Sequence, residues 1–143
     1  MVARIPGTET LVVADEDHRA LHIAQDARRA SSRDAFTTVE LPGAPAQVVA
    51  WGDTILVTIR DPGMLIRLEL AGGVAKETGR APLPADAWGL AVTRDARRAV
   101  VTSAWTHKVS VVDLESLSPV ATLDVAREPR GITLTRDGRT AFV

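Results

Sequence analysis

The sequence predicts an all-β chain built from short antiparallel hairpins, and three of its features support this fold class. Its apolar runs are about five to seven residues long, rich in Val, Leu, Ile and Thr, and they end at Asp, Gly, Pro or Ser. No window has the apolar period of about 3.6 residues that marks an amphipathic helix. One segment also recurs at a fixed spacing, which is typical of folds that stack copies of one unit.

The clearest repeat lies in the second half of the chain. Residues 129–143 align with residues 87–101 at an offset of 42 without a gap. A glycine, the tripeptide Thr-Arg-Asp and an arginine before the next apolar run coincide in the two segments. Residues 55–58 match residues 99–102 at an offset of 44. The turn at residues 51–54 accounts for the difference of two residues, because turns tolerate deletions.

Each repeat unit contains four expected strands. Four strands in about 42 residues is the size of one blade of a β-propeller. A single four-stranded meander cannot bury both of its faces, so blades stack face to face around an axis. We therefore predict a partial β-propeller of about three four-stranded antiparallel blades with a 42-residue repeat. The expected units are a partial blade at 10–41 that lacks its first strand, blades at 45–84 and 87–125, and the start of a further blade at 129–143.

Two local expectations follow from this division. Residues 25–34 lengthen one turn and should form a solvated loop or one short helical turn. In the strand that begins at Lys108, residues alternate in polarity. Successive side chains of a strand point to opposite faces. We therefore expect Val109 and Val111 to be buried between blades and Ser110 to face the other way.

The best repeats resemble the YVTN-type β-propeller repeat. A blade of that family has the pattern P-x-G-I-A-V-T-P-D-G-x-x-A-Y-V-T-N, a short loop, and then T-V-S-V-I-D. Residues 129–143 match the first part, and residues 108–113 match the second. Arg94 and Arg136 stand where the family has proline, and Phe142 stands at its tyrosine. These motif residues build turns and strand packing, so the resemblance implies a fold more strongly than a function.

The resemblance also carries expectations about the whole protein. About 3.3 blades are visible, whereas single-chain propellers usually close with four to eight, so we expect a fragment of a larger protein. Similar repeats occur in bacterial extracytoplasmic proteins, fused to modules that bind c-type haem. The resemblance therefore implies a periplasmic or extracellular location. Residues 1–7 lack the apolar segment of a signal peptide.

Composition narrows the classes of function. The 143 residues are 45% hydrophobic and 24% charged, as in globular domains. The net charge is −1, which provides no general attraction for nucleic acid. The chain has no cysteine, which excludes disulfides, Cys-ligated zinc and c-type haem attachment within it. We expect no cofactor in this chain, no nucleic-acid partner and, without an apolar run of about 18 residues, no membrane span.

Candidate binding residues lie in loops that the blade topology brings to one rim. These loops join the second strand to the third, and the fourth strand to the next blade. Glu16, Arg60 and Asp86 fall in the same loops. The residues predicted to bind a protein or small-molecule ligand are Asp15, His18, Asp61, Trp88, Trp105, His107, Arg127 and Arg130.

The histidines of this rim allow two interpretations, a metal site or ordinary exposed residues. His18 and His107 occupy corresponding loops of different blades. If both faced the axis, they would share a metal with Asp15 or Asp61 as the carboxylate partner. Two histidines on loops without a fixed ligand spacing are more often ordinary exposed residues, so we predict no metal site.

The aromatic and basic residues of the rim leave alternatives open as well. Trp88 and Trp105 form either a patch for a ligand or packing between blades. Arg127 and Arg130 either clamp a carboxylate or phosphate or pair with acidic neighbours at the surface. Packing between blades is the favoured interpretation for the tryptophans, and pairing at the surface is favoured for the arginines.

The sequence favours a non-catalytic scaffold or binding module, since it lacks the motifs of nucleophilic, metalloprotease and nucleotide sites. We expect no catalytic residue in this chain. The alternative is the propeller part of an oxidoreductase of the c-type haem peroxidase kind, or a lactonase-like metal-dependent hydrolase. We also expect self-association through open blade edges, either as aggregates or as dimers that complete a ring of six to eight blades.

Overall fold

The computed structural model describes the backbone of residues 1–143 and every side chain except that of Arg33. In this described chain the regular structure is all strand apart from one short 3-10 turn, η1 (Arg33–Ala35), and no helix is long and apolar enough to cross a membrane. The turn η1 lies in the segment that was expected to be a loop or a single helical turn. The prediction of an all-β fold is confirmed.

Three four-stranded sheets and one two-stranded sheet follow one another along the chain. Within each sheet every strand pairs antiparallel with the next strand in sequence, so each sheet is a simple meander. The strands are β1 (Val2–Arg4), β2 (Leu11–Asp15), β3 (Ala20–Ala24) and β4 (Thr37–Glu40); β5 (Pro45–Trp51), β6 (Thr54–Ile59), β7 (Met64–Ala71) and β8 (Val74–Pro82); β9 (Ala87–Val92), β10 (Arg98–Ser103), β11 (Lys108–Asp113) and β12 (Ser118–Asp124); β13 (Thr133–Leu134) and β14 (Ala141–Phe142).

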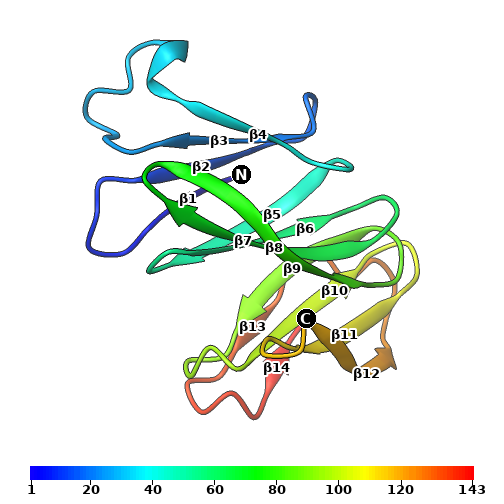
Figure 1. The fold of residues 1–143 in the computed structure, drawn as a ribbon. Coiled ribbons are helices and arrows are strands. Elements are labelled where there is room, and N and C mark those ends of the chain that lie inside the picture. Colours follow the sequence, from blue (N-terminus) through cyan, green and yellow to red (C-terminus); the bar gives the residue numbers. More distant parts are fainter.

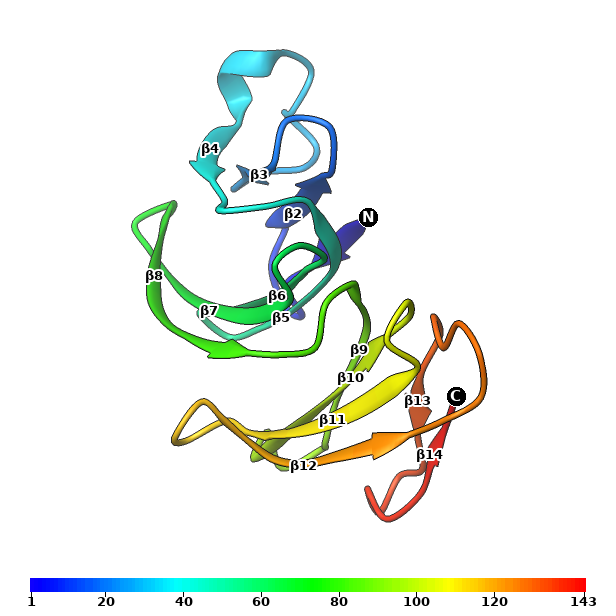
Figure 2. The same cartoon turned by 90° about the vertical axis from the view of Figure 1, so that its right-hand side faces the viewer.

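The sheets lie face to face in sequence order (Figures 1 and 2). We call them blades one to three, and the sheet of β13 and β14 the half-blade. The first strands of neighbouring sheets are in contact, with β5 between β1 and β9, and β9 between β5 and β13. The chain therefore turns about an axis on the side of these first strands, which is the arrangement of propeller blades.

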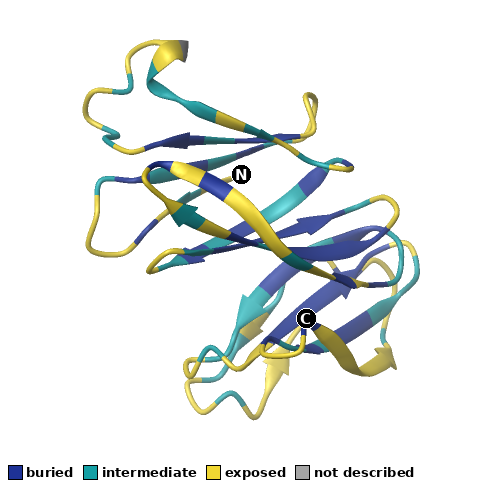
Figure 3. Ribbon diagram, viewed as in Figure 1, coloured by how far each residue is buried: buried dark blue, intermediate teal, exposed yellow. Residues whose placement is uncertain are grey.

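The core consists of two apolar layers, one between each pair of complete blades. The middle strand β6 is buried on both faces, because its side chains alternate between the two layers. Ile55 and Val57 pack towards Leu21 and Ile23 of the first blade. Leu56 faces the third blade and belongs to the second layer. Figure 3 shows this burial in the middle strands, in contrast to β12, which is exposed along its whole length.

The first blade is complete, which corrects the prediction that its first strand is missing. Residues Val2 to Arg4 form β1 and pair with Val13 to Leu11 of β2. The side chain of Ala3 packs against the first apolar layer. This strand has only three residues and lies outside the aligned repeat, so neither alternation nor repetition could reveal it.

The prediction for β11 is confirmed for the burial of Val109 and for the opposite direction of Ser110, but it is wrong about Val111, and it did not foresee that Ser110 is itself buried. Ser110 is fully buried, and its hydroxyl hydrogen-bonds the Thr122 hydroxyl at 3.1 Å. It lies opposite Val101, so it shares a face with Val112, which belongs to the layer between blades two and three. Val109 is buried on the other face, and Val111 there is only half-buried. A serine satisfied by a cross-strand partner thus takes an inner position.

The turn between the first two strands needs a left-handed residue in three of the sheets. Gly52, Ala96 and Gly138 have φ values of 50°, 55° and 68°. They are related by the repeat, at spacings of 44 and 42. Glycine adopts this conformation without strain, whereas alanine has a Cβ that disfavours it. Ala96 is therefore a strained position that the other repeats avoid.

We expect Ala96→Gly to stabilise the fold by about 0.5–1 kcal/mol, because relief of the left-handed strain outweighs the entropy of glycine in the unfolded chain. Urea denaturation followed by tryptophan fluorescence measures this change. The matched control is Gly138→Ala, which should destabilise, since its Cβ would also lie 3.3 Å from Cγ2 of Thr93. An A96G variant no more stable than the parent would contradict the prediction.

Candidate functional site

The loops between the second and third strands have a left-handed residue at the same position in the three blades. Arg19, Gly63 and His107 have positive φ values of 52°, 95° and 56° and are spaced 44 residues apart. Their carbonyl oxygens accept hydrogen bonds from the end of the fourth strand, so both kinds of loop meet at one rim, as the topology predicted. The donors are the backbone N–H groups of Leu41, Leu83 and Val125, at 2.8, 3.0 and 2.9 Å.

This register shows that Arg19, and not His18, corresponds to His107. His18 is exposed and binds Asp15, whereas Nδ1 of His107 accepts a hydrogen bond of 3.2 Å from the backbone of Glu128. The two histidines therefore have different surroundings. Among the described residues, no group of three or more His, Cys, Asp or Glu side chains is placed to hold a metal ion.

Arg60 links the three complete blades at this rim. It follows β6, and its Nε donates a hydrogen bond of 2.7 Å to Oδ1 of Asp86, just before β9. Its Nη1 donates to Glu16 of the first blade. The hydrogen bond to Asp86 is the main reason why the pKa of Arg60 is raised above its ordinary value. The guanidinium is thus a permanent positive charge between two carboxylates.

Asp86 is the most constrained residue of this cluster. Its side chain is only 1% exposed, and its φ of 60° is left-handed, a conformation that costs a non-glycine residue free energy. Its backbone N–H donates to the carbonyl of Arg60 at 2.6 Å, and its carbonyl accepts from Ala104 at 3.0 Å. Its second carboxylate oxygen, Oδ2, has no hydrogen-bond partner among the described residues. Strain and an unsatisfied buried acceptor are features of functional sites.

Two tryptophans lie against the arginines of the rim. The guanidinium carbons of Arg60 and Arg130 lie 4.5 and 4.6 Å from the ring centroid of Trp88. Arg60 also lies 5.7 Å from the ring of Trp105. Trp88 is half-buried, whereas Trp105 is 66% exposed. Trp88 therefore serves contacts between blades, and Trp105 presents most of its surface to solvent.

Two other predicted residues, Arg127 and Asp61, lie outside this cluster. Arg127 and Asp61 are exposed and make no side-chain hydrogen bond or ion pair with the described residues. Arg130 lies 3.9 Å from the carboxylate of Glu128, at the limit of an ion pair. The structure thus brings Trp88, Trp105 and Arg130 together: Arg60 lies against both tryptophans, and Arg130 lies against Trp88. Sequence reasoning placed Arg60 on the rim without assigning it a role.

Asp15 and His18 belong to a different place, a hollow of about 540 Å³ on the open face of the first blade. Oδ2 of Asp15 lies 2.8 Å from Nδ1 of His18 and 3.1 Å from Nε2 of His22. The backbone N–H of His18 also donates to Asp15 and is the main cause that lowers the pKa of this carboxyl far below its ordinary value. Asp15 is therefore a fixed anion between two imidazoles. The lining residues are Val13, Asp15, His18, Ala20, His22, Phe36, Thr38 and Glu40.

Solved structures resemble almost the whole chain at low sequence identity. Hydrazine synthase of Kuenenia stuttgartiensis matches with a TM-score of 0.84 at 14% identity and covers 98% of the chain. A 6-phosphogluconolactonase candidate from Bacteroides fragilis matches with 0.84 at 13% identity over 99% of the chain. The WD40 β-propeller domain of Doa1 matches with 0.78 at 10% identity over 96%. No protein-family model and no curated protein sequence matches the chain.

The chain spans less than half the length of these structures, namely 40%, 46% and 45%. At such identities the likeness establishes the fold alone. It agrees with the stacked meanders, the inner first strands and the common rim described above. The chain has the fold of a β-propeller, of which it contains three complete blades and two strands of a fourth.

Proposed function

We propose that the chain is a non-catalytic binding module of the YVTN propeller type, and that the rim around Trp105 and Arg130 binds a protein segment. The observation that carries this proposal is the exposed Trp105, 66% open to solvent beside the fixed guanidinium of Arg60. Tryptophan and arginine dominate the binding energy of protein interfaces. A location outside the cytoplasm and membership of a longer protein remain predictions from the YVTN resemblance.

The chemistry of the rim defines the partner. Trp105 offers an aromatic surface for stacking or for an apolar side chain. Arg130 is half exposed and only loosely paired with Glu128, so its guanidinium is free to receive a carboxylate with two parallel hydrogen bonds. Arg60 is already engaged by two carboxylates and holds the tryptophans in place. The partner segment should therefore combine an acidic residue with an aromatic or proline residue.

Selection of a random peptide-display library on the purified chain tests this proposal. We expect the enriched peptides to carry Asp or Glu next to an aromatic or proline residue. Trp105→Ala and Arg130→Ala should each weaken their binding about tenfold or more, which corresponds to about 1.4 kcal/mol.

Arg97→Ala is the matched control, because Arg97 is exposed in a turn at the opposite end of the third blade. This variant should bind the selected peptides like the parent. The proposal fails if no peptide is enriched above background. It also fails if the enriched peptides bind W105A and R130A as tightly as they bind the parent chain.

A further inference from the structure

We propose that Arg94 and Arg136 form a binding site for a phosphate group, in the hollow between the third blade and the half-blade. This hollow has a volume of about 310 Å³ and lies at the end of the blades opposite Trp105. Its two arginines come from equivalent turns of neighbouring sheets, 42 residues apart. The site is separate from the rim of the proposed function, so each can be tested without the other.

The acidic residue of each Thr-Arg-Asp turn is used by the turn itself. Oδ1 of Asp95 accepts hydrogen bonds from the hydroxyl of Thr93 at 2.7 Å and from the backbone of Arg97 at 3.1 Å. In the half-blade Asp137 accepts the same two bonds, from Thr135 at 2.6 Å and from Arg139 at 3.1 Å. These carboxylates thus stabilise their turns and form no ion pair with the arginine beside them.

The turn does not require an arginine. In three of the sheets, the N–H of the last residue before this turn donates a hydrogen bond to the carbonyl five places later: Ile5 to Thr10, Thr93 to Arg98 and Thr135 to Thr140. By this register Pro6 of the first blade stands where Arg94 and Arg136 stand. Proline suits that place in a turn because its φ is already set. Arginine in the two later sheets therefore needs a reason other than the backbone.

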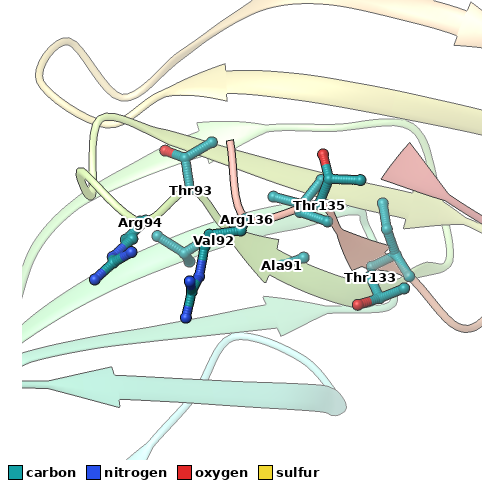
Figure 4. Close-up of a pocket in the computed structure, with 9 residues that line it drawn as sticks. Ala91, Val92, Thr93, Arg94, Thr133, Thr135 and Arg136 are labelled. Atoms are coloured by element: carbon teal, nitrogen blue, oxygen red, sulfur yellow. The ribbon is translucent and has the colours of Figure 1, made fainter. Parts of the chain in front are cut away.

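The two guanidinium groups lie on the same side of the hollow. Figure 4 shows the side chains of Arg94 and Arg136 extending in the same direction from their turns. Both are exposed, and neither has a hydrogen bond or ion pair with any residue that the structure describes. Two like charges that line one hollow repel each other unless an anion lies between them. None of the described residues supplies a negative charge to these two arginines. A bound anion would supply it.

The rest of the lining suits a phosphate group. Apolar side chains such as Val92 and Leu134 form part of the wall, and such surroundings strengthen an ionic contact by reducing the local dielectric constant. A guanidinium binds two oxygens of a phosphate in parallel, which a monovalent chloride cannot match. Thr133 adds an exposed hydroxyl at the wall. The chemistry points to a dianionic phosphate, either free or carried by a small molecule.

Titration calorimetry at low ionic strength with inorganic phosphate, and separately with phenyl phosphate, tests this site. We expect both to bind the parent chain. The double variant R94Q/R136Q should bind them about tenfold more weakly or not at all. The control R97Q/R139Q removes the same charge from exposed turn residues that do not line the hollow, and it should bind like the parent.

Sodium chloride at matched ionic strength separates specific binding from screening, and far-UV circular dichroism verifies that both double variants are folded. If R94Q/R136Q is unfolded, the single variant Arg136→Gln is used with Arg139→Gln as its control. Tighter binding of phenyl phosphate than of inorganic phosphate identifies a phosphorylated small molecule as the ligand; the reverse order identifies the free anion. The proposal is overturned if neither probe binds at millimolar concentration, or if both double variants respond equally.

Discussion

Arg60→Ala is expected to destabilise the fold by about 3–5 kcal/mol, because it leaves the carboxylate of Asp86 buried without its partner. Asp86 is 1% exposed and already has one unsatisfied oxygen. The substitution also removes a guanidinium from Trp88 and cuts the link to the first blade at Glu16. Urea denaturation measures the loss, which is a large part of the net stability of a domain, about 5–15 kcal/mol.

Two further variants identify the cause of this loss. Glu16→Ala removes a partner whose side chain is 52% exposed, so it should cost no more than about 1 kcal/mol. R60A/D86N should be more stable than R60A, because the amide carries no charge and asparagine tolerates the left-handed φ at this position. The explanation is wrong if R60A lies within about 1 kcal/mol of the parent, or if the second substitution does not recover stability.

The second large effect concerns association between chains. Val120 and Leu123 on the outer strand β12 are 57% and 61% exposed, and Phe142 on β14 is 61% exposed. The outer edges of β12 and β14 carry no further strand. Exposed apolar side chains beside unpaired strand edges favour association. Burial of about 200 Å² of apolar surface would contribute about 5 kcal/mol.

We propose a second copy of the chain as the occupant of these surfaces. Because one chain spans 40–46% of the solved propellers that it matches, two copies supply nearly the length of one propeller. The half-blade of one copy would then stack on the open face of the other copy's first blade, completing a ring. Light scattering of the purified chain should therefore give at least twice its mass of 15.3 kDa.

Charge substitutions on these surfaces test whether the chains associate through them or through other parts of the molecule. Leu123→Lys combined with Phe142→Lys should shift the mass towards the monomer, whereas Glu115→Lys, at an exposed turn, should not. Large aggregates instead of a dimer would show that the edges pair without closing a ring. A stable monomer of the parent chain that unfolds cooperatively would exclude association altogether.

Repetition in the sequence predicted the turns well, because a turn depends on a few adjacent residues. The inner strand β1 and the inner position of Ser110 depend instead on contacts with another strand or another blade. A three-residue strand has too little alternation to be recognised. A serine counts as polar in the sequence pattern, and the pattern does not show whether a hydroxyl on the neighbouring strand will form the hydrogen bond that allows its burial. Burial between blades is therefore decided by partners that the local pattern does not contain.

The candidate site, too, could be predicted only as far as it depends on local sequence. Blade topology was enough to place Trp88, Trp105 and Arg130 at one rim. The contact between Arg60 and Asp86 joins residues 26 positions apart, and it arises only once neighbouring blades have stacked. Side chains that meet across blades share no sequence spacing that a motif search recognises, so their pairing had to come from the structure.

The loops of the first and third blades place different side chains at the same tip. Asp17 and Trp105 each stand two residues before a left-handed residue, and both are exposed. Both loops also have the same hydrogen bond, from the N–H of the left-handed residue to the carbonyl three residues earlier. Neither side chain is needed to form the loop, since an aspartate and a tryptophan occupy the same place in it. The rim thus separates architecture from recognition: exchange of these two side chains between blades would change what the surface binds while every strand, turn and core layer stayed as it is.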